Sequence, residues 1–166
     1  MFDVGDAVYH PTHGAGVIAN VRNMPTLRKG QQFYRIRMLA GTKTILLVPV
    51  RNAEELGLRP AVTRDQVADV MRILSSEPVM LPDKHKQRYS VCQEKLDAAD
   101  TMRTAEVVRD LSMRRVQHDH LNVPGRLIYK KAMGLLAGEL AVAQDVTLAE
   151  AEAQIDEALK QQQVAA

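Results

Sequence analysis

The side chains in this 166-residue chain that are best suited to metal binding or catalysis are two histidine pairs. His10 and His13 lie on either side of a Pro-containing turn, and imidazoles so close together can bind a metal ion. No cysteine or pair of carboxylates stands nearby to complete the ligand set. His118 and His120, with Asp119 between them, would need a third ligand from elsewhere. They suit the end of a helix, where the dipole favours imidazolium. We therefore predict no metal site and no other cofactor.

Other signatures of catalysis are weak. Cys92, the only cysteine, lies on the apolar stripe of a predicted helix, where a thiol is inert rather than nucleophilic. A single cysteine also excludes an intramolecular disulfide and is typical of a reducing cytoplasm. The chain contains no phosphate-binding loop, no dinucleotide-binding glycine motif and no nucleophile elbow. We predict that the protein is not an enzyme, and a small metal-dependent enzyme is the weakest alternative.

A cluster of basic residues favours binding over catalysis. Lys84, Lys86 and Arg88 lie at the predicted start of a helix, where the helix dipole prefers acidic side chains. Cations in that place indicate an external anion, and the phosphate backbone of a nucleic acid is the natural candidate. Arg126 and Lys130 extend the cluster if the helices that carry them pack alongside. A solvated helix face explains the same pattern equally well.

The charges are sorted along the chain, although the net charge is only +2. Residues 1–60 contain eight Lys or Arg against four Asp or Glu, and residues 84–131 contain eleven against six. Residues 139–166 contain one against six. Two basic regions and one acidic region favour an anionic partner.

Strand patterns dominate the first sixty residues. In 32–38, apolar and basic residues alternate with a period of two, so Tyr34 and Ile36 share one face of a strand. The run 44–50 is continuously apolar, which means either burial on both faces or a sheet edge that awaits a partner. Pro49 favours the edge, because proline is tolerated there and not in central strands. We predict a small β-barrel of four or five strands and place the first domain at residues 1–58.

Helical patterns dominate the rest of the chain. Residues that cap helices precede each apolar periodic segment, and two of the caps are Thr–x–x–Gln/Glu capping boxes. The predicted capping residues are Thr63 with Gln66, Asp83, Asp100, Asn122, and Thr147 with Glu150. We predict an α+β fold in which the barrel is followed by an all-α domain of about five helices at residues 59–166.

An ordered series of motifs resembles the CarD/CdnL family of bacterial transcription regulators. The motifs are VGDxVYHPxHGxGVI at the start, VPV at 48–50, RYxxxxEKL at 88–96, AEVVRDL at 105–111 and GELAxA at 138–143. The first module is also similar to the RNA-polymerase-interacting domain of transcription-repair coupling factors, which continue into helicase motifs that this chain lacks. The resemblance implies a Tudor-like barrel that docks on the β subunit of RNA polymerase by pairing a strand edge.

The docking residues that this resemblance implies lie on the apolar run and on the preceding hairpin. They are Arg22, Arg28, Thr44, Ile45, Leu46, Leu47, Val48 and Pro49. Leu47 replaces a basic residue that some relatives use against the polymerase, and the candidates to compensate for it are Arg22, Arg28 and Lys29 on the preceding hairpin.

The resemblance also implies that the helical domain touches promoter DNA at the upstream edge of the melted region and stabilises the open complex. The expected DNA-contacting residues are Lys84, His85, Lys86, Arg88 and Arg126, and we add Lys130 because it extends the same basic patch. His85 stands where the family has a tryptophan that wedges into the minor groove, and its imidazole fills less volume than an indole ring. The DNA contact is expected to be independent of base sequence.

A protein-interaction adaptor that docks on RNA polymerase without touching DNA is the alternative from another functional class. In either case we expect a cytoplasmic protein associated with the nucleoid through RNA polymerase. It is expected to act as a monomer and to have no membrane partner. The N-terminus has neither the basic start nor the apolar run of a signal peptide, and no apolar run approaches membrane-spanning length.

Overall fold

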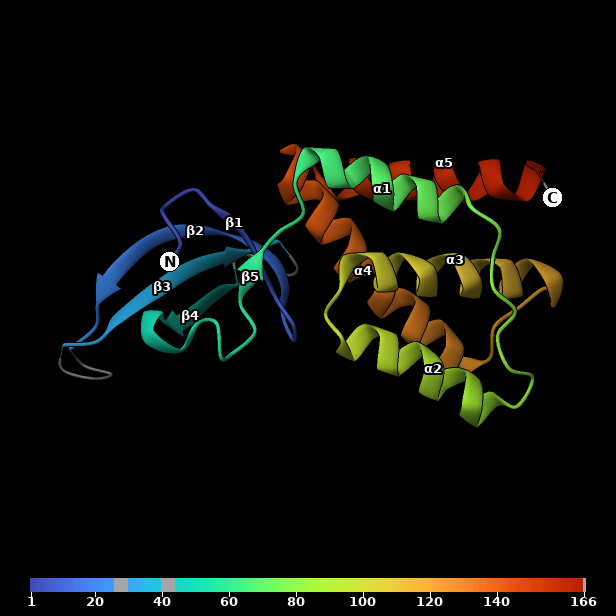
Figure 1. Cartoon of the computed structure of the whole chain (residues 1–166), viewed down its shortest axis with the longest axis horizontal. Coiled ribbons are helices and arrows are strands. Elements are labelled where there is room, and N and C mark those ends of the chain that lie inside the picture. The colour runs from blue at the N-terminus through green and yellow to red at the C-terminus, as the bar shows by residue number, and fades with distance from the viewer. Residues whose placement is uncertain (26–29, 40–43, 166) are drawn as a thin grey trace.

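A bent antiparallel sheet and a group of five helices lie side by side in the computed structural model, which describes residues 1–25, 30–39 and 44–165 (Figure 1). The sheet has the order β4-β3-β2-β1-β5. Its strands are β1 (Ala7–His10), β2 (Gly14–Asn23), β3 (Gln32–Met38), β4 (Ile45–Pro49) and β5 (Arg59–Pro60). A short 3-10 helix, η1 (Val50–Asn52), follows β4. The predicted α+β fold with a Tudor-like first module is confirmed, although the barrel is not closed.

The alternation in β3 builds the core of the sheet domain. Tyr34, Ile36 and Met38 are buried, whereas Arg35 and Arg37 are exposed. The inner face packs on apolar side chains from β1, β2 and β4. Strand pairing therefore places the two arginines on the outer face, as the period-two pattern predicts.

Two glycines in the opening segment are required by the geometry of the sheet. Gly14 has a φ of +78°, which side-chain-bearing residues rarely adopt. A Cβ on Gly16 would lie 2.7 Å from the carbonyl oxygen of Arg37, so only glycine lets β2 approach β3 this closely. The turn between β1 and β2 thus depends on Gly14, and the close pairing of β2 with β3 depends on Gly16.

Capping residues start most of the helices. These are α1 (Arg64–Ser75), α2 (His85–Asp97), α3 (Thr101–Gln117), α4 (Val123–Gln144) and α5 (Leu148–Ala165). Thr63 forms the predicted capping box with Gln66, and Asp100 and Asn122 accept hydrogen bonds at the starts of α3 and α4. The predicted cap at Asp83 is wrong, because Lys84 occupies the N-cap position of α2 and makes no side-chain capping bond.

The helical core forms around α3, which packs against α1 and α4, while α5 covers α1 and α4. Val108, Leu111, Leu136, Leu140 and Ile155 are fully buried there. No single helix in the described residues is long and apolar enough to cross a membrane; α4 and α5 reach that length and composition only as a pair bent by 113°. The division into domains 1–58 and 59–166 stays a prediction.

Candidate functional site

Strand β4 forms one edge of the sheet and pairs with β3 alone among the described residues. The backbone N–H of Met38 donates to the carbonyl of Thr44. Because bonded and non-bonded pairs alternate in an antiparallel ladder, Leu46 and Val48 also bond to β3. The backbone groups of Ile45 and Leu47 therefore point away from β3. This edge is the candidate docking surface.

Three arginines share the outer face of the sheet beside this edge. Arg35 is paired with Leu47 and Arg37 with Ile45, and cross-strand partners project from the same face. Arg22 in β2 is paired with Phe33 on that face. All three arginines are exposed, and none forms an ion pair with a described residue. Ile45 and Leu47 are 40% and 37% exposed, so the edge is both apolar and basic.

The predicted docking residues differ in what they present to the free edge. The Val48 side chain is buried in the sheet core, and that of Leu46 packs against the same core. Because the backbones of both residues face β3, neither residue presents a polar group to the free edge. Thr44, like Arg22, is exposed, whereas Arg28 and Lys29 lie outside the described residues.

The sequence-based prediction missed Arg35 and Arg37 as docking candidates. The period-two pattern places them on the exposed face of β3, but only the β3–β4 register places them beside Leu47 and Ile45.

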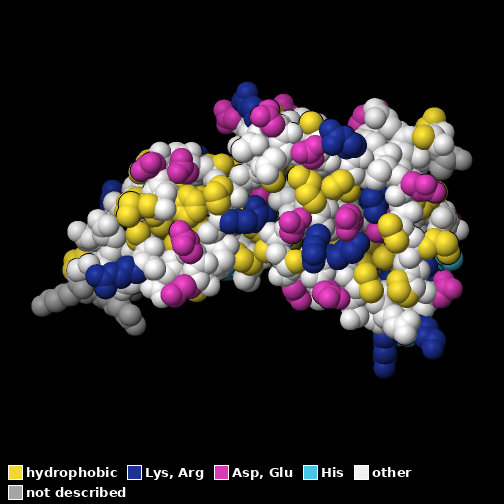
Figure 2. All heavy atoms as spheres, in the orientation of Figure 1, with side chains coloured by type: hydrophobic (Ala, Val, Ile, Leu, Met, Phe, Trp, Pro, Cys, Tyr) yellow, Lys and Arg dark blue, Asp and Glu magenta, His cyan; other side chains and the backbone are white. Residues whose placement is uncertain are grey.

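The predicted DNA surface begins at the start of α2. Lys84, His85 and Lys86 are exposed, and the first turn of α2 contains no acidic residue. Figure 2 shows Lys and Arg side chains projecting at the end of the helical domain where α2 begins. No side chain caps α2, so the first amide groups of the helix have no side-chain acceptor, and these cations lie next to them in the sequence.

Arg88, unlike the two lysines, is buried beneath this surface. Its side chain is buried, and the residue is 6% exposed. Its Nη1 donates to the carbonyls of Pro82 and Asp83 at 2.9 and 2.8 Å. The guanidinium therefore fixes the segment that enters α2, because it bonds the carbonyls that precede the helix.

The start of α4 lies beside α2. The Tyr89 hydroxyl donates to Oδ1 of Asn122, which also accepts the N–H of Gly125 and so caps α4. Arg126 is exposed and donates one hydrogen bond to the carbonyl of Leu121. Lys130, one turn further on, is exposed as well. The Tyr89–Asn122 contact joins the two helices that carry the predicted DNA-contacting residues.

The groups considered for catalysis occupy ordinary structural environments. Cys92 is buried, and burial raises the pKa of its thiol to about 11. Burial and the neighbouring His13 lower the pKa of His10, so that its imidazole is neutral near pH 7. Among the described residues no group of three or more His, Cys, Asp or Glu side chains is arranged to hold a metal ion.

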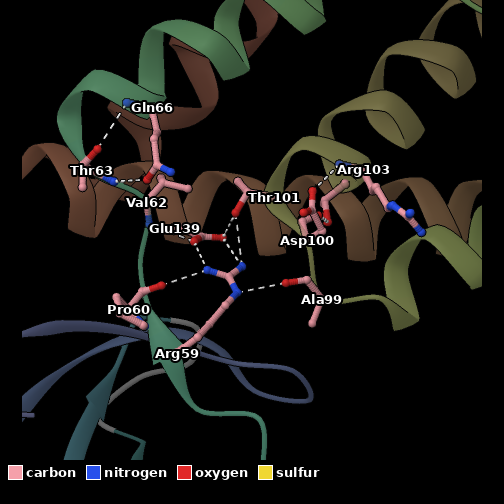
Figure 3. A network of polar contacts seen from close by, with 11 residues as sticks. Arg59, Pro60, Val62, Thr63, Gln66, Ala99, Asp100, Thr101, Arg103 and Glu139 are labelled. Carbon is pink, nitrogen blue, oxygen red and sulfur yellow. Dashed lines mark hydrogen bonds and ion pairs between the residues drawn. The ribbon is translucent and has the colours of Figure 1, made fainter. Parts of the chain in front are cut away.

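A second feature missed from the sequence lies between the sheet and the helices. Arg59 in β5 forms an ion pair with Glu139 in α4 at 2.6 Å (Figure 3). The two residues are 80 positions apart, and no local pattern connects them.

Comparisons with known proteins agree with both parts of the fold. Residues 2–62 match the family model described as CarD-like/TRCF RID domain, and residues 69–156 match that of the CarD C-terminal domain. YdeB of Bacillus subtilis (strain 168), whose name describes it as a candidate transcription factor, is 32% identical over 149 residues. These residues make up 89% of this chain and 95% of that protein.

The RID domain family is associated with binding to the β subunit of RNA polymerase, and both matching domains are non-enzymatic. The chain therefore belongs to the CarD family of transcription regulators, with a CarD-like RID domain followed by a CarD C-terminal domain.

Proposed function

We propose that this protein binds the β subunit of RNA polymerase through the free edge of β4 and contacts promoter DNA through the starts of α2 and α4. Bound at the upstream edge of the transcription bubble, it stabilises the open complex. The observation that carries the proposal is the exposed edge of β4 within a domain of the CarD-like RID family.

The polymerase contact is proposed to be strand addition. The outward N–H and C=O groups of Ile45 and Leu47 provide main-chain hydrogen bonds to an added strand, and their side chains provide apolar contact. Pro49 ends the donating edge because it has no N–H. The exposed guanidinium groups of Arg22, Arg35 and Arg37 favour acidic residues on the partner. Arg35 lies beside Leu47, the position at which some relatives have a basic residue.

The DNA contact is proposed to involve mainly phosphates. Lys84 and Lys86 are exposed beside the uncapped start of α2, and helix-start amides bind phosphate oxygens. His85 lies between them and reaches the minor groove at the distorted duplex edge. Arg126 and Lys130 extend the contact along α4. A protein that binds only the distorted duplex stabilises the open complex, because it shifts the equilibrium toward the state it binds.

Replacing Leu47 with proline tests the docking surface. The change removes an outward N–H without removing a donor to β3, and we expect binding to the isolated β-subunit lobe to weaken at least tenfold. Leu47→Thr retains the N–H and serves as the matched control, with a smaller expected loss. Equal affinities for the two variants, with folding verified by circular dichroism, would exclude strand addition at this edge.

The salt dependence of duplex binding tests the DNA surface. Removing two phosphate contacts with Lys84→Ala/Lys86→Ala should reduce the slope of log affinity against log salt by about 2. Arg64→Ala/Lys160→Ala removes the same charge from exposed positions on α1 and α5 and should leave the slope unchanged. If the parent protein binds polymerase but no DNA even at low salt, the result supports an adaptor without DNA contact.

A further inference from the structure

Arg59 is the centre of a polar network between the sheet and the helices (Figure 3). Its Nε donates to the carbonyl of Ala99 at 2.9 Å. Its Nη1 donates to the carbonyl of Pro60 and to Glu139, and its Nη2 donates to Thr101 and to Glu139. Every N–H of the guanidinium thus has an acceptor, and the planar fork permits this set in one orientation only.

Glu139 is the acidic partner and has almost no access to water. Its side chain is 2% exposed, compared with 29% for Arg59. Besides Arg59, its carboxylate accepts the backbone N–H of Val62 at 3.0 Å and the Thr101 hydroxyl at 2.9 Å. Removing Arg59 would leave a buried carboxylate without its cationic partner, which is strongly destabilising. Arg59 and Glu139 therefore hold each other in place.

The network reaches three helices from a single strand. Arg59 is held to the sheet by its backbone pairing with Tyr9, and its guanidinium lies 4.1 Å from the centre of the Tyr9 ring. Thr101 starts α3, Glu139 belongs to α4, and Val62 lies just before α1. The Arg59 network, defined as Tyr9, Arg59, Val62, Ala99, Thr101 and Glu139, therefore joins both domains.

Among the described residues, the side-chain hydrogen bonds and ion pairs that join the sheet to the helices belong to this network, and apolar side chains also meet across the boundary. A Cβ on Gly14 would lie 3.4 Å from Leu135 in α4, and one on Gly138 would lie 3.9 Å from the Ala15 side chain. Leu39 packs against the helical core. Apolar contacts of small residues are non-directional, whereas charge-assisted hydrogen bonds have strict geometry. The Arg59 network is thus the part of the boundary that specifies an angle.

We propose that Arg59 and Glu139 are positioning residues that set the angle between the sheet and the helices, so that both contact surfaces can engage one polymerase–promoter complex simultaneously. The consequence for binding rests on the proposed function, whereas the angle between the sheet and the helices is a property of the free protein. Two linked contacts reinforce each other only when the geometry permits simultaneous engagement. Loss of the network should therefore reduce combined binding far more than either separate affinity.

The angle can be measured with spin labels on the full chain. Glu54→Cys and Glu152→Cys provide exposed labelling sites, one on each domain, and the buried Cys92 stays unlabelled. We expect a single narrow distance distribution for the parent and a broadened or shifted one for Glu139→Ala. Arg59→Lys retains the positive charge but loses the planar guanidinium, and it should broaden the distance distribution as well. This second variant keeps the test decisive if Glu139→Ala does not fold. Arg72→Ala, which breaks an exposed ion pair with Asp69 within α1, is the matched control and should change nothing.

The functional arm compares separate with combined binding. For Arg59→Lys, the affinities for the β-subunit lobe and for duplex DNA should stay within about twofold of the parent, while affinity for the polymerase–promoter complex falls about 100-fold. A distance distribution with the same width and the same centre as the parent's in both variants would overturn the inference, whatever the binding results. A broadened distribution with undiminished combined binding would also overturn it. A parent protein that binds neither partner would refute the proposed function, whereas the distance distributions would still decide whether the network sets the angle.

Discussion

Lys84, Lys86 and Arg88 stand at alternate positions in the sequence, but the fold gives them different roles. The first two are exposed, whereas Arg88 is buried and bonds the carbonyls of Pro82 and Asp83. Helical geometry separates Lys86 from Arg88, since residues two positions apart lie on different faces of a helix. Lys84 precedes the first helical residue as the N-cap of α2, so this rule does not apply to it. Arg88 shares the inner face of α2 with Cys92 and Leu96, which are also buried.

Truncating Arg88 should therefore affect stability. Arg88→Ala leaves two carbonyls at the entrance to α2 without a donor, and we expect the free energy of unfolding to fall by about 1–3 kcal/mol. Urea denaturation measures this change, and Lys86→Ala is the control, with an expected change within about 0.5 kcal/mol. Weakened DNA binding by Arg88→Ala with unchanged stability would instead assign Arg88 to the DNA surface.

At the scale of elements, α2 begins differently from its neighbours. Side chains accept backbone N–H groups at the starts of α1, α3, α4 and α5, through Thr63, Asp100, Asn122 and Thr147. The N-cap of α2 is Lys84, which offers no acceptor. A lysine in this place sacrifices helix stability, and the proposed phosphate contact supplies a reason for it.

Replacing Lys84 with serine should separate stability from function. Serine accepts an N–H at the helix start, so the free energy of unfolding should rise by about 0.5–1 kcal/mol. DNA affinity should fall at the same time, because one cation is lost. Lys86→Ser is the matched comparison, since it loses a charge without gaining a cap. Gains in both stability and DNA affinity for Lys84→Ser would contradict the proposed role of Lys84.

At the scale of the whole molecule, each domain buries a group that should ionise only at high pH. Burial and the nearby Glu139 raise the pKa of Tyr9, in the sheet, from 10.0 to about 12. Burial raises the pKa of Cys92, in the helices, from 9.0 to about 11. Above pH 9 the unfolded chain loses these protons before the folded protein does, so the free energy of unfolding should fall as pH rises toward 12.

Urea denaturation between pH 8 and about pH 11 checks this alkaline dependence. Tyr9→Phe retains the aromatic ring beneath Arg59 and removes the phenolic proton, and Cys92→Ala removes the thiol. Each variant should show a shallower decline than the parent. A decline of unchanged slope in both would mean that other groups control alkaline stability.

Local sequence patterns were sufficient in most places where the responsible interactions join residues a few positions apart. The caps at Thr63, Asp100 and Asn122 are examples, and so is the alternation that buries Tyr34 and exposes Arg35. The predicted cap at Asp83 is wrong, because the helix starts one residue later with Lys84 as its N-cap, and the buried Arg88 bonds the carbonyl of Asp83. The edge position of β4 also followed from a local signal, because Pro49 restricts the strand to an edge.

The tertiary structure decided which side chains the fold brings together. The β3–β4 register placed Arg35 beside Leu47, and alternation in the ladder left Ile45 and Leu47 with outward backbone groups. The ion pair of Arg59 with Glu139 spans 80 positions. Periodicity and spacing record only which face of its own element a residue occupies. The packing of one element against another determined these contacts, because it depends on the shapes and charges of both at once.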